Sequence, residues 1–198
     1  TPAGGSAASL HLLLDGAIAD GRSVELLYSQ LFALYSNPQA LLLAQDVTFR
    51  DYVHSLQRFG ASEAGAAARA YHRERLSAIP QGPQLALPVA PDSRRGHIRL
   101  SARIRGFARI KERALALGVK SDIVALTAYL EALAAHATDP EFTVVVVNWD
   151  RLPLAQKIDQ VVGDFCSLSL ISRRAGAAAL QDKMQHYQRI LAADWQHS

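Results

Sequence analysis

Residues 10–23 read LHLLLDGAIADGRS, and this stretch decides how the chain begins to fold. Leucines occupy both sets of alternating positions over residues 10–14, which indicates a strand buried on both faces. The glycines at 16 and 21 indicate a loop, and Ser23 stands immediately before a periodic segment. Leucines then recur at helical spacing up to Tyr35, and Asn37-Pro38 stops the pattern. The unit therefore reads strand, loop, helix.

The rest of the chain alternates helical and strand patterns. Helices are predicted from Thr48, over the Ala-rich segment to Leu76, over Phe107–Leu117 up to Gly118, over Ser121–Leu133 and over Leu180–Trp195. Strands are predicted over His97–Arg103, Phe142–Val147 and Phe165–Ile171. This order predicts an α/β or α+β sandwich. On the final helix, an apolar stripe is expected to face the core: Leu180, Met184, Tyr187 and Leu191.

A Pro- and Gly-rich segment divides the chain. Prolines at 80, 83, 88 and 91 and a glycine at 82 break the periodicity for a dozen residues. We therefore expect a linker over 1–9, the end of a first lobe with its crossover helices over 10–79, a second linker over 80–96, and part of a second lobe over 97–198.

Composition excludes several classes of protein. The 198 residues carry 21 basic and 18 acidic side chains, a net charge of +3, and 49% are hydrophobic, which is typical of a globular protein. The basic residues are scattered rather than gathered in a stripe, so nucleic acid is not an expected partner. No apolar run approaches the roughly 20 residues that cross a bilayer. With a single cysteine and no signal-peptide pattern, we expect a reducing, cytoplasmic protein.

The spacing Asp15-x-x-x-x-Asp20-x-x-Ser23 places two carboxylates and a hydroxyl at the predicted strand-to-helix junction. Paired carboxylates can divide acid and base roles, or one can brace the loop through an arginine. Taken alone, residues of these types near a turn are more often helix caps and turn formers. The residues by themselves leave these interpretations open.

The spacing resembles the D-x-x-x-x-D-x-x-S hallmark of heterocyclization domains, the cyclising branch of the condensation domains of nonribosomal peptide synthetases. Three further segments are similar to that family in the same order along the chain. They are TFRDY over 48–52 with RERL over 73–76, FT over 142–143 with DRLPL over 150–154, and VGDFCSL over 162–168. The resemblance implies a two-lobe sandwich related to chloramphenicol acetyltransferase, incomplete at both ends.

The motif has two competing registers, because His11-x-x-x-Asp15-Gly16 also imitates the H-H-x-x-x-D-G motif of ordinary condensation domains. Asp20-Gly21 lies just before Ser23, where the motif aspartate is expected, so the register that gives Asp20 this role is preferred. The resemblance then implies that Asp20 pairs with Arg151 and braces the cleft between the lobes. Asp15 and Ser23 are expected to line the cleft or fix the loop, and Asp15, Asp20 and Ser23 are the candidate catalytic residues at the cleft.

His11 and Cys166 are the remaining candidates for chemistry. His11 is a candidate general base, although a partly buried structural histidine is the favoured interpretation. Cys166 is expected to be a small buried hydrophobe, and the resembled family has threonine there. The histidines and the cysteine follow no metal-ligand spacing, so no metal site is predicted.

The resemblance implies substrates presented on the phosphopantetheine of carrier proteins, with no directly bound cofactor. The expected partners are peptidyl or aminoacyl carrier proteins and neighbouring synthetase domains, and the expected pathway makes an antibiotic or a siderophore. The implied reaction is amide formation with cyclodehydration, or a derived dehydration or elimination on one tethered chain. The threonine and aspartate assigned to cyclodehydration match no residue here. A non-catalytic carrier-docking or scaffolding module is the alternative, and self-association is expected to cover exposed sheet edges.

Overall fold

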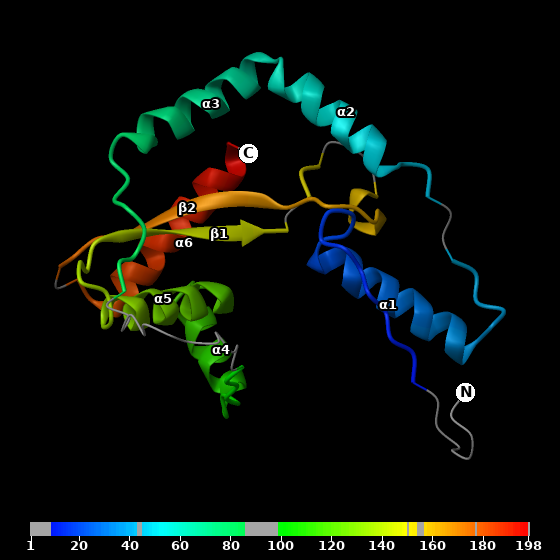
Figure 1. Cartoon of the computed structure of the whole chain (residues 1–198), viewed down its shortest axis with the longest axis horizontal. Coiled ribbons are helices and arrows are strands. Elements are labelled where there is room, and N and C mark those ends of the chain that lie inside the picture. Colours follow the sequence, from blue (N-terminus) through cyan, green and yellow to red (C-terminus); the bar gives the residue numbers. More distant parts are fainter. Residues whose placement is uncertain are drawn as a thin grey trace, which may run out of the picture. The chain divides into compact units, whose positions relative to one another are not determined.

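The computed structural model describes residues 9–42, 45–85, 99–149, 151–153, 157–176 and 178–197. Figure 1 shows the order of the elements along the chain. They are α1 (Gly21–Ser36), α2 (Phe49–Gly60), α3 (Glu63–Leu76), α4 (Phe107–Ala116), α5 (Ser121–Ala134), β1 (Phe142–Asn148), a 3-10 turn η1 (Ile158–Gln160), β2 (Ser167–Arg173) and α6 (Leu180–Gln196). Helices and strands mix as the sequence predicts, and the α/β class is confirmed.

The chain divides into two compact units. The first unit contains Thr1–Ala66 and Val147–Ser167, and the second contains Ala67–Val146 and Leu168–Ser198. Each unit therefore combines segments that are far apart in the sequence. The lobe boundaries expected from the Pro- and Gly-rich segment stay a prediction, because residues 86–98 and 1–8 lie outside the described part.

The second unit is built on the strand pair β1–β2. The hydroxyls of Thr143 and Ser172 lie 3.0 Å apart, which joins the start of β1 to the end of β2 and makes the pair antiparallel. Helix α5 packs against α4 and α6. The buried core contains Ala114, Val119, Ile123, Leu130, Phe142, Ile171, Met184 and Tyr187. Three of the four stripe residues of α6 face this core as predicted, whereas Leu180 is exposed.

Two ion-pair networks fasten the second unit. Nε and Nη2 of Arg173 donate hydrogen bonds to the Glu131 carboxylate at 3.1 and 3.0 Å. Lys183 donates a third to the same carboxylate at 3.0 Å. These contacts, with Arg173 first, lower the pKa of Glu131 below its usual range despite partial burial. In the other network, Arg75 contacts the buried Asp194 of α6 and donates to the Leu170 carbonyl at 3.0 Å. Helix α3 is thereby joined to both α6 and β2.

The first unit has a separate aromatic core. Its buried residues are Tyr52, Ile158, Val161 and Phe165, with Phe49 packed against them. The Phe165 ring lies 4.7 Å from the Tyr52 ring and edge-on to Phe49 at 5.1 Å. A capping box formed by Thr48 and Asp51 starts α2 and directs Phe49 and Tyr52 toward Phe165. This core supports the segment that follows η1.

Two predicted strands are wrong. Residues 10–14 form no strand and are largely exposed, with Leu13 fully so. Residues 99–103 likewise form no strand, while residues 97 and 98 of that prediction lie outside the described part. A strand is stable only beside a partner strand, and the described residues pair just β1 with β2 in a sheet. Apolar alternation cannot reveal whether such a partner exists. The other predicted elements are present, with ends shifted by a few residues.

Leu130 tests the core of the second unit. Its side chain is completely buried, so Leu130→Ala is expected to lower the free energy of unfolding by about 2–5 kcal/mol. Leu115→Ala, a leucine 78% exposed on α4, is the matched control and should change it by less than about 0.5 kcal/mol. Urea denaturation measures both, and equal effects of the two substitutions would contradict the core assignment.

Candidate functional site

The loop before α1 ends in a helix cap. Asp20 has extended backbone angles, and its Oδ1 accepts a hydrogen bond from the Ser23 backbone N–H at 2.7 Å. The backbone N–H of Asp20 in turn donates to the Gly163 carbonyl at 3.0 Å. The helix therefore begins at Gly21, before the position that periodicity indicated, and Ser23 lies within its first turn. Asp20 is the residue that starts the helix.

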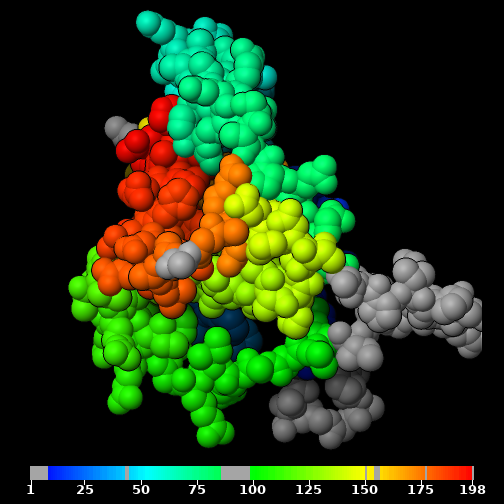
Figure 2. Space-filling model, turned by 90° about the vertical axis from the view of Figure 1, so that its left-hand side faces the viewer, coloured from blue at the N-terminus to red at the C-terminus, as the bar shows by residue number. Residues whose placement is uncertain are grey.

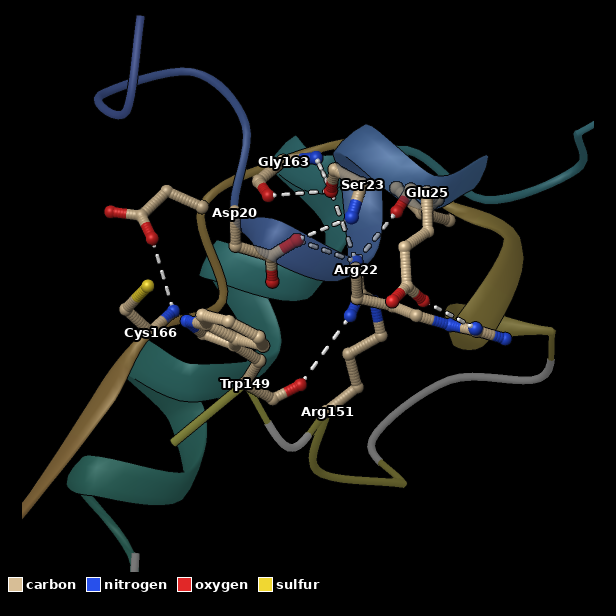
Figure 3. Close-up of polar contacts among 10 residues, drawn as sticks. Asp20, Arg22, Ser23, Glu25, Trp149, Arg151, Gly163 and Cys166 are labelled. Carbon is tan, nitrogen blue, oxygen red and sulfur yellow. Dashed lines mark hydrogen bonds and ion pairs between the residues drawn. The ribbon is translucent and has the colours of Figure 1, made fainter. Parts of the chain in front are cut away.

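Asp20 also forms the ion pair that the resemblance implies. Nη2 of Arg151 lies 3.1 Å from Oδ1 of Asp20, and both side chains are almost completely buried. The guanidinium lies over the Phe165 ring at 4.1 Å from its centroid and donates to the carbonyls of Val161 and Trp149. Figure 3 shows Arg151 approaching Asp20 from the side opposite Gly163. Of the two registers, the one that makes Asp20 the motif aspartate contains this buried pair.

The pair is joined at one point, not by a two-pronged fork. Nε of Arg151 and Oδ2 of Asp20 are both buried and have no hydrogen-bond partner among the described residues. Arg173 and Glu131 in the second unit show the two-pronged alternative. Arg151 instead uses its Nη2 for three acceptors, namely Asp20, the Ser23 hydroxyl and the Val161 carbonyl. Arg151 therefore binds both the start of α1 and the segment that follows η1.

The Ser23 hydroxyl is fully occupied. Oγ donates to the Gly163 carbonyl at 2.9 Å and accepts from the Gly163 N–H and from Arg151 Nη2, both at 3.0 Å. Since the side chain is buried and its only proton points at a carbonyl, this geometry suits a structural link rather than a nucleophile. Ser23 joins the first turn of α1 to the segment that follows η1.

Two glycines allow this close packing. A side-chain carbon on Gly163 would overlap the Phe49 ring, and one on Gly21 would lie 2.8 Å from the Trp149 ring. Neither glycine can carry a side chain unless an aromatic ring moves. No role for Gly163 is predicted from the residues themselves. Its place in the VGDFCSL segment was the signal that pointed to it.

Two opposing effects set the pKa of Asp20, namely burial and the interactions with Ser23 and Arg151. Burial favours the neutral carboxyl and would raise the pKa, but hydrogen bonding by Ser23 and the charge of Arg151 outweigh it. The net result is a pKa below the usual aspartate value. Asp20 is therefore a carboxylate at neutral pH, which makes it a fixed charge instead of a proton donor.

Asp15 and His11 are outside this cluster. Both are exposed, and Asp15 makes a tight turn in which its Oδ1 accepts from the Ala17 N–H at 2.9 Å and its carbonyl accepts from the Ile18 N–H at 3.1 Å. The favoured interpretation of His11 as partly buried is wrong, because the predicted strand that would have buried it does not form. The motif thus splits into a buried half and an exposed half.

Cys166 is exposed, so its expected burial is wrong. The neighbouring Phe165 enters the aromatic core, and the next side chain in the extended chain points the other way. Its backbone N–H donates to Asp164 Oδ1 at 3.0 Å. Desolvation of the thiol by neighbouring atoms, and then Asp164, raise its pKa to about 11, so it stays protonated at neutral pH. A protonated thiol is a poor nucleophile.

The described residues contain neither a metal-binding cluster nor a membrane-spanning helix. Across the described ranges, no three His, Cys, Asp or Glu side chains come together in a way that would hold a metal ion. Within the same part of the chain, no helix has the length and apolar character needed to cross a bilayer.

Breaking the ion pair should destabilise the protein. Asp20→Asn keeps a capping side chain but removes the charge opposite Arg151, so the free energy of unfolding should fall by about 3–5 kcal/mol. Arg22→Gln removes one partner of the exposed pair with Glu25 and should cost less than about 1 kcal/mol. Chemical denaturation measures both. A loss for Asp20→Asn no greater than that for Arg22→Gln would contradict the structural role of the pair.

The same pair should show in the pH dependence of stability. Because the folded state lowers the pKa of Asp20, its contribution is complete above the unfolded value of 3.8 and is lost as pH falls through the folded value. The stability difference between the natural chain and Asp20→Asn should therefore be constant at neutral pH and shrink below about pH 3.8. Denaturation curves recorded over this range measure it, and a difference that grows on acidification would be inconsistent with this sign.

Comparison with known proteins finds sequence relatives and solved structures that are similar to the chain. No family model matches the chain. The chain is 35% identical over 178 residues to pyochelin synthetase PchF from Pseudomonas aeruginosa, a match that covers 85% of this chain and 10% of PchF. The chain thus spans about a tenth of that relative.

Solved structures of nonribosomal peptide synthetases also match the chain. The nonribosomal peptide synthetase FmoA3 (S1046A) matches with a TM-score of 0.75 and 31% identity, over 90% of this chain and 19% of FmoA3. The cyclization-docking bidomain of the synthetase EpoB from Sorangium cellulosum matches with a TM-score of 0.80 and 24% identity, over 91% of this chain and 38% of that structure. The EpoB match confirms the fold expected from the motifs. The sequence relatives of the chain are therefore nonribosomal peptide synthetases of the heterocyclization type, and its fold is that of their condensation and cyclization domains.

Proposed function

We propose that the chain forms part of a domain that acts on aminoacyl or peptidyl thioesters held on the phosphopantetheine arms of carrier proteins. The reaction is formation of an amide, in which an amine displaces the thiol of a thioester and loses a proton. Cyclodehydration of a Cys, Ser or Thr residue follows, or one tethered chain loses water. The product class is a siderophore or an antibiotic, and PchF, named as a pyochelin synthetase, supports this assignment.

The observation that carries the proposal is the division of the motif. Asp20, Ser23, Arg151 and Gly163 form a buried cluster in the first unit, which holds the start of α1 in place. Asp15 lies five residues earlier, exposed, in a turn closed by its own carboxylate. Because a carboxylate that accepts protons must reach its substrate, Asp15 is the candidate catalytic residue of the pair. Asp20, Ser23 and Arg151 act as positioning residues.

His11 is the second exposed candidate. It lies four residues before Asp15, and an imidazole can exchange protons near neutral pH. We assign it a supporting role, as a proton acceptor or donor to the tethered amine.

The competing function is a non-catalytic module that docks carrier proteins. The burial of the Asp20, Ser23 and Arg151 side chains and the hydrogen bonds that join them favour it, because these groups would be retained for folding alone. Self-association is a further prediction for either function. Helix α1 exposes the aromatic side chains of Tyr28, Phe32 and Tyr35 along one stripe, which supplies apolar surface for it. Light scattering of the purified protein measures the oligomeric state.

Asp15→Asn separates the two functions. The substitution keeps the turn-forming side chain and removes the charge, so the free energy of unfolding should change by less than about 0.5 kcal/mol. Product formation should fall at least about 100-fold if the carboxylate transfers a proton. The assay is intact mass spectrometry of carriers loaded with Ser, Thr or Cys thioesters, before and after incubation with the protein.

Glu25→Gln, an exposed carboxylate on α1, is the matched control and should leave turnover unchanged. Loss of water from one carrier would identify an elimination, and transfer between two carriers would identify condensation. Full turnover by Asp15→Asn would remove Asp15 from the mechanism. Unchanged carriers together with measurable carrier binding would favour the docking module.

A further inference from the structure

A shallow groove runs along α6 in the second unit. One pocket of about 380 Å³ lies between α6 and the segment that follows β2, and a neighbouring pocket of about 240 Å³ shares Arg174 and His186 with it. Figure 2 looks onto this face, where α6, coloured orange to red, lies beside the orange end of β2. We call these two connected pockets the α6 groove. The proposed function makes no use of it.

Positive charge lines the α6 groove. Its cationic side chains are Arg75, Arg174, Lys183 and Arg189, and Asp182 is its one carboxylate in the described residues. Three of the cations are held by carboxylates outside the lining. Lys183 contacts Glu131 at 3.0 Å, Arg174 contacts Glu141 at 3.5 Å, and Arg75 contacts Asp194. These contacts fix the side chains, and Glu131 is shared with Arg173, so its charge is divided between two cations.

Arg189 differs from the other three. Within residues 9–197 as described, it has no carboxylate at ion-pair distance, and it lies close enough to His186 to influence it. Partial burial and then Arg189 lower the pKa of His186 below its usual range. The groups facing His186 are Asp182, Lys183 and Arg189 on its own helix, Arg174 after β2 and Arg75 from α3. An unpaired cation beside a neutral imidazole is an unfilled place for an anion.

The size and walls of the groove narrow the choice of anion. Ala175 and Ala178 add apolar surface next to the cations, and about 380 Å³ is several times the volume of a single phosphate group. Arginine is well suited to phosphate, because its planar guanidinium binds two oxygens at once. A bare ion would leave the apolar wall unused, whereas an organic body attached to the phosphate would cover it.

We propose that the α6 groove binds the phosphate group of a phosphorylated organic molecule, with Arg189 and Arg174 on the phosphate and the apolar wall against the attached body. Two sources share this chemistry. One is the phosphate of a carrier protein's pantetheine arm, which rests on the proposed function, and the other is a free nucleotide. In either case the bound anion stabilises the charged form of His186 and raises its pKa.

The test is a titration of the protein with phosphopantetheine, AMP, inorganic phosphate and phosphate-free pantetheine, followed by NMR of the His186 ring. His186→Gln assigns the resonance. We expect phosphopantetheine or AMP to bind and to raise the pKa of His186, and we expect pantetheine to leave it unchanged. The tighter of the two organic phosphates identifies the source. Equal binding of inorganic phosphate would overturn the role of the apolar wall.

Two substitutions with opposite expected effects on phosphopantetheine affinity strengthen this test. Arg189→Gln should weaken phosphopantetheine binding about tenfold, because a charge-assisted contact is lost. Asp182→Asn should strengthen it several-fold, because a like charge is removed from the groove. Arg109→Gln, an exposed arginine on α4, is the matched control and should change nothing.

The proposal is wrong if no phosphate compound shifts His186, if pantetheine binds as well as phosphopantetheine, or if Arg189→Gln and Asp182→Asn act in the same direction. These readouts measure binding and not turnover. Their failure would therefore leave the Asp15 experiment unaffected, and failure of that experiment would leave phosphate binding to be judged by this titration alone.

Discussion

The buried charge of Arg151 is the constraint on which the first unit depends. A guanidinium removed from water is costly unless acceptors surround it, and here the acceptors come from two distant segments: Asp20 and Ser23 at the start of α1, and the Val161 carbonyl after η1. The Phe165 ring covers one face of the guanidinium. Moving either segment would leave a buried cation short of partners, so the charge fixes the two segments together.

The features that sequence reasoning predicted well are local ones. Periodicity located α2 to α6 and β1, because helix and strand patterns are properties of a few neighbouring residues. The pairing of Asp20 with Arg151, 131 positions apart, came from resemblance to a family and not from spacing. Nothing within the chain's own pattern distinguishes Arg151 from a surface arginine. Long-range contacts of this kind need either a known relative or a structure.

The failures have a common physical origin. Residues 10–14 are as apolar as a buried strand, but their structure depends on neighbours that the pattern does not contain. Cys166 was expected inside because cysteine is usually buried, yet the alternation that sends Phe165 into the aromatic core turns the next residue outward. Ser23 was expected to line the cleft or fix the loop, and its hydroxyl makes three hydrogen bonds, two to Gly163 and one to Arg151. The type of a residue limits the chemistry that it can perform. Its hydrogen-bond and packing partners decide which role it has in the structure.

The division of the motif has a consequence for how such a site evolves. Asp20, Ser23, Gly163 and Arg151 depend on one another, so a change in any of them is penalised by folding before catalysis is affected. Asp15 and His11 are not constrained by folding in this way, because their exposed side chains support little beyond one turn. The exposed half is therefore free to change with the reaction while the buried half stays the same. A motif that identifies the fold through its buried residues can accordingly persist in domains whose chemistry differs.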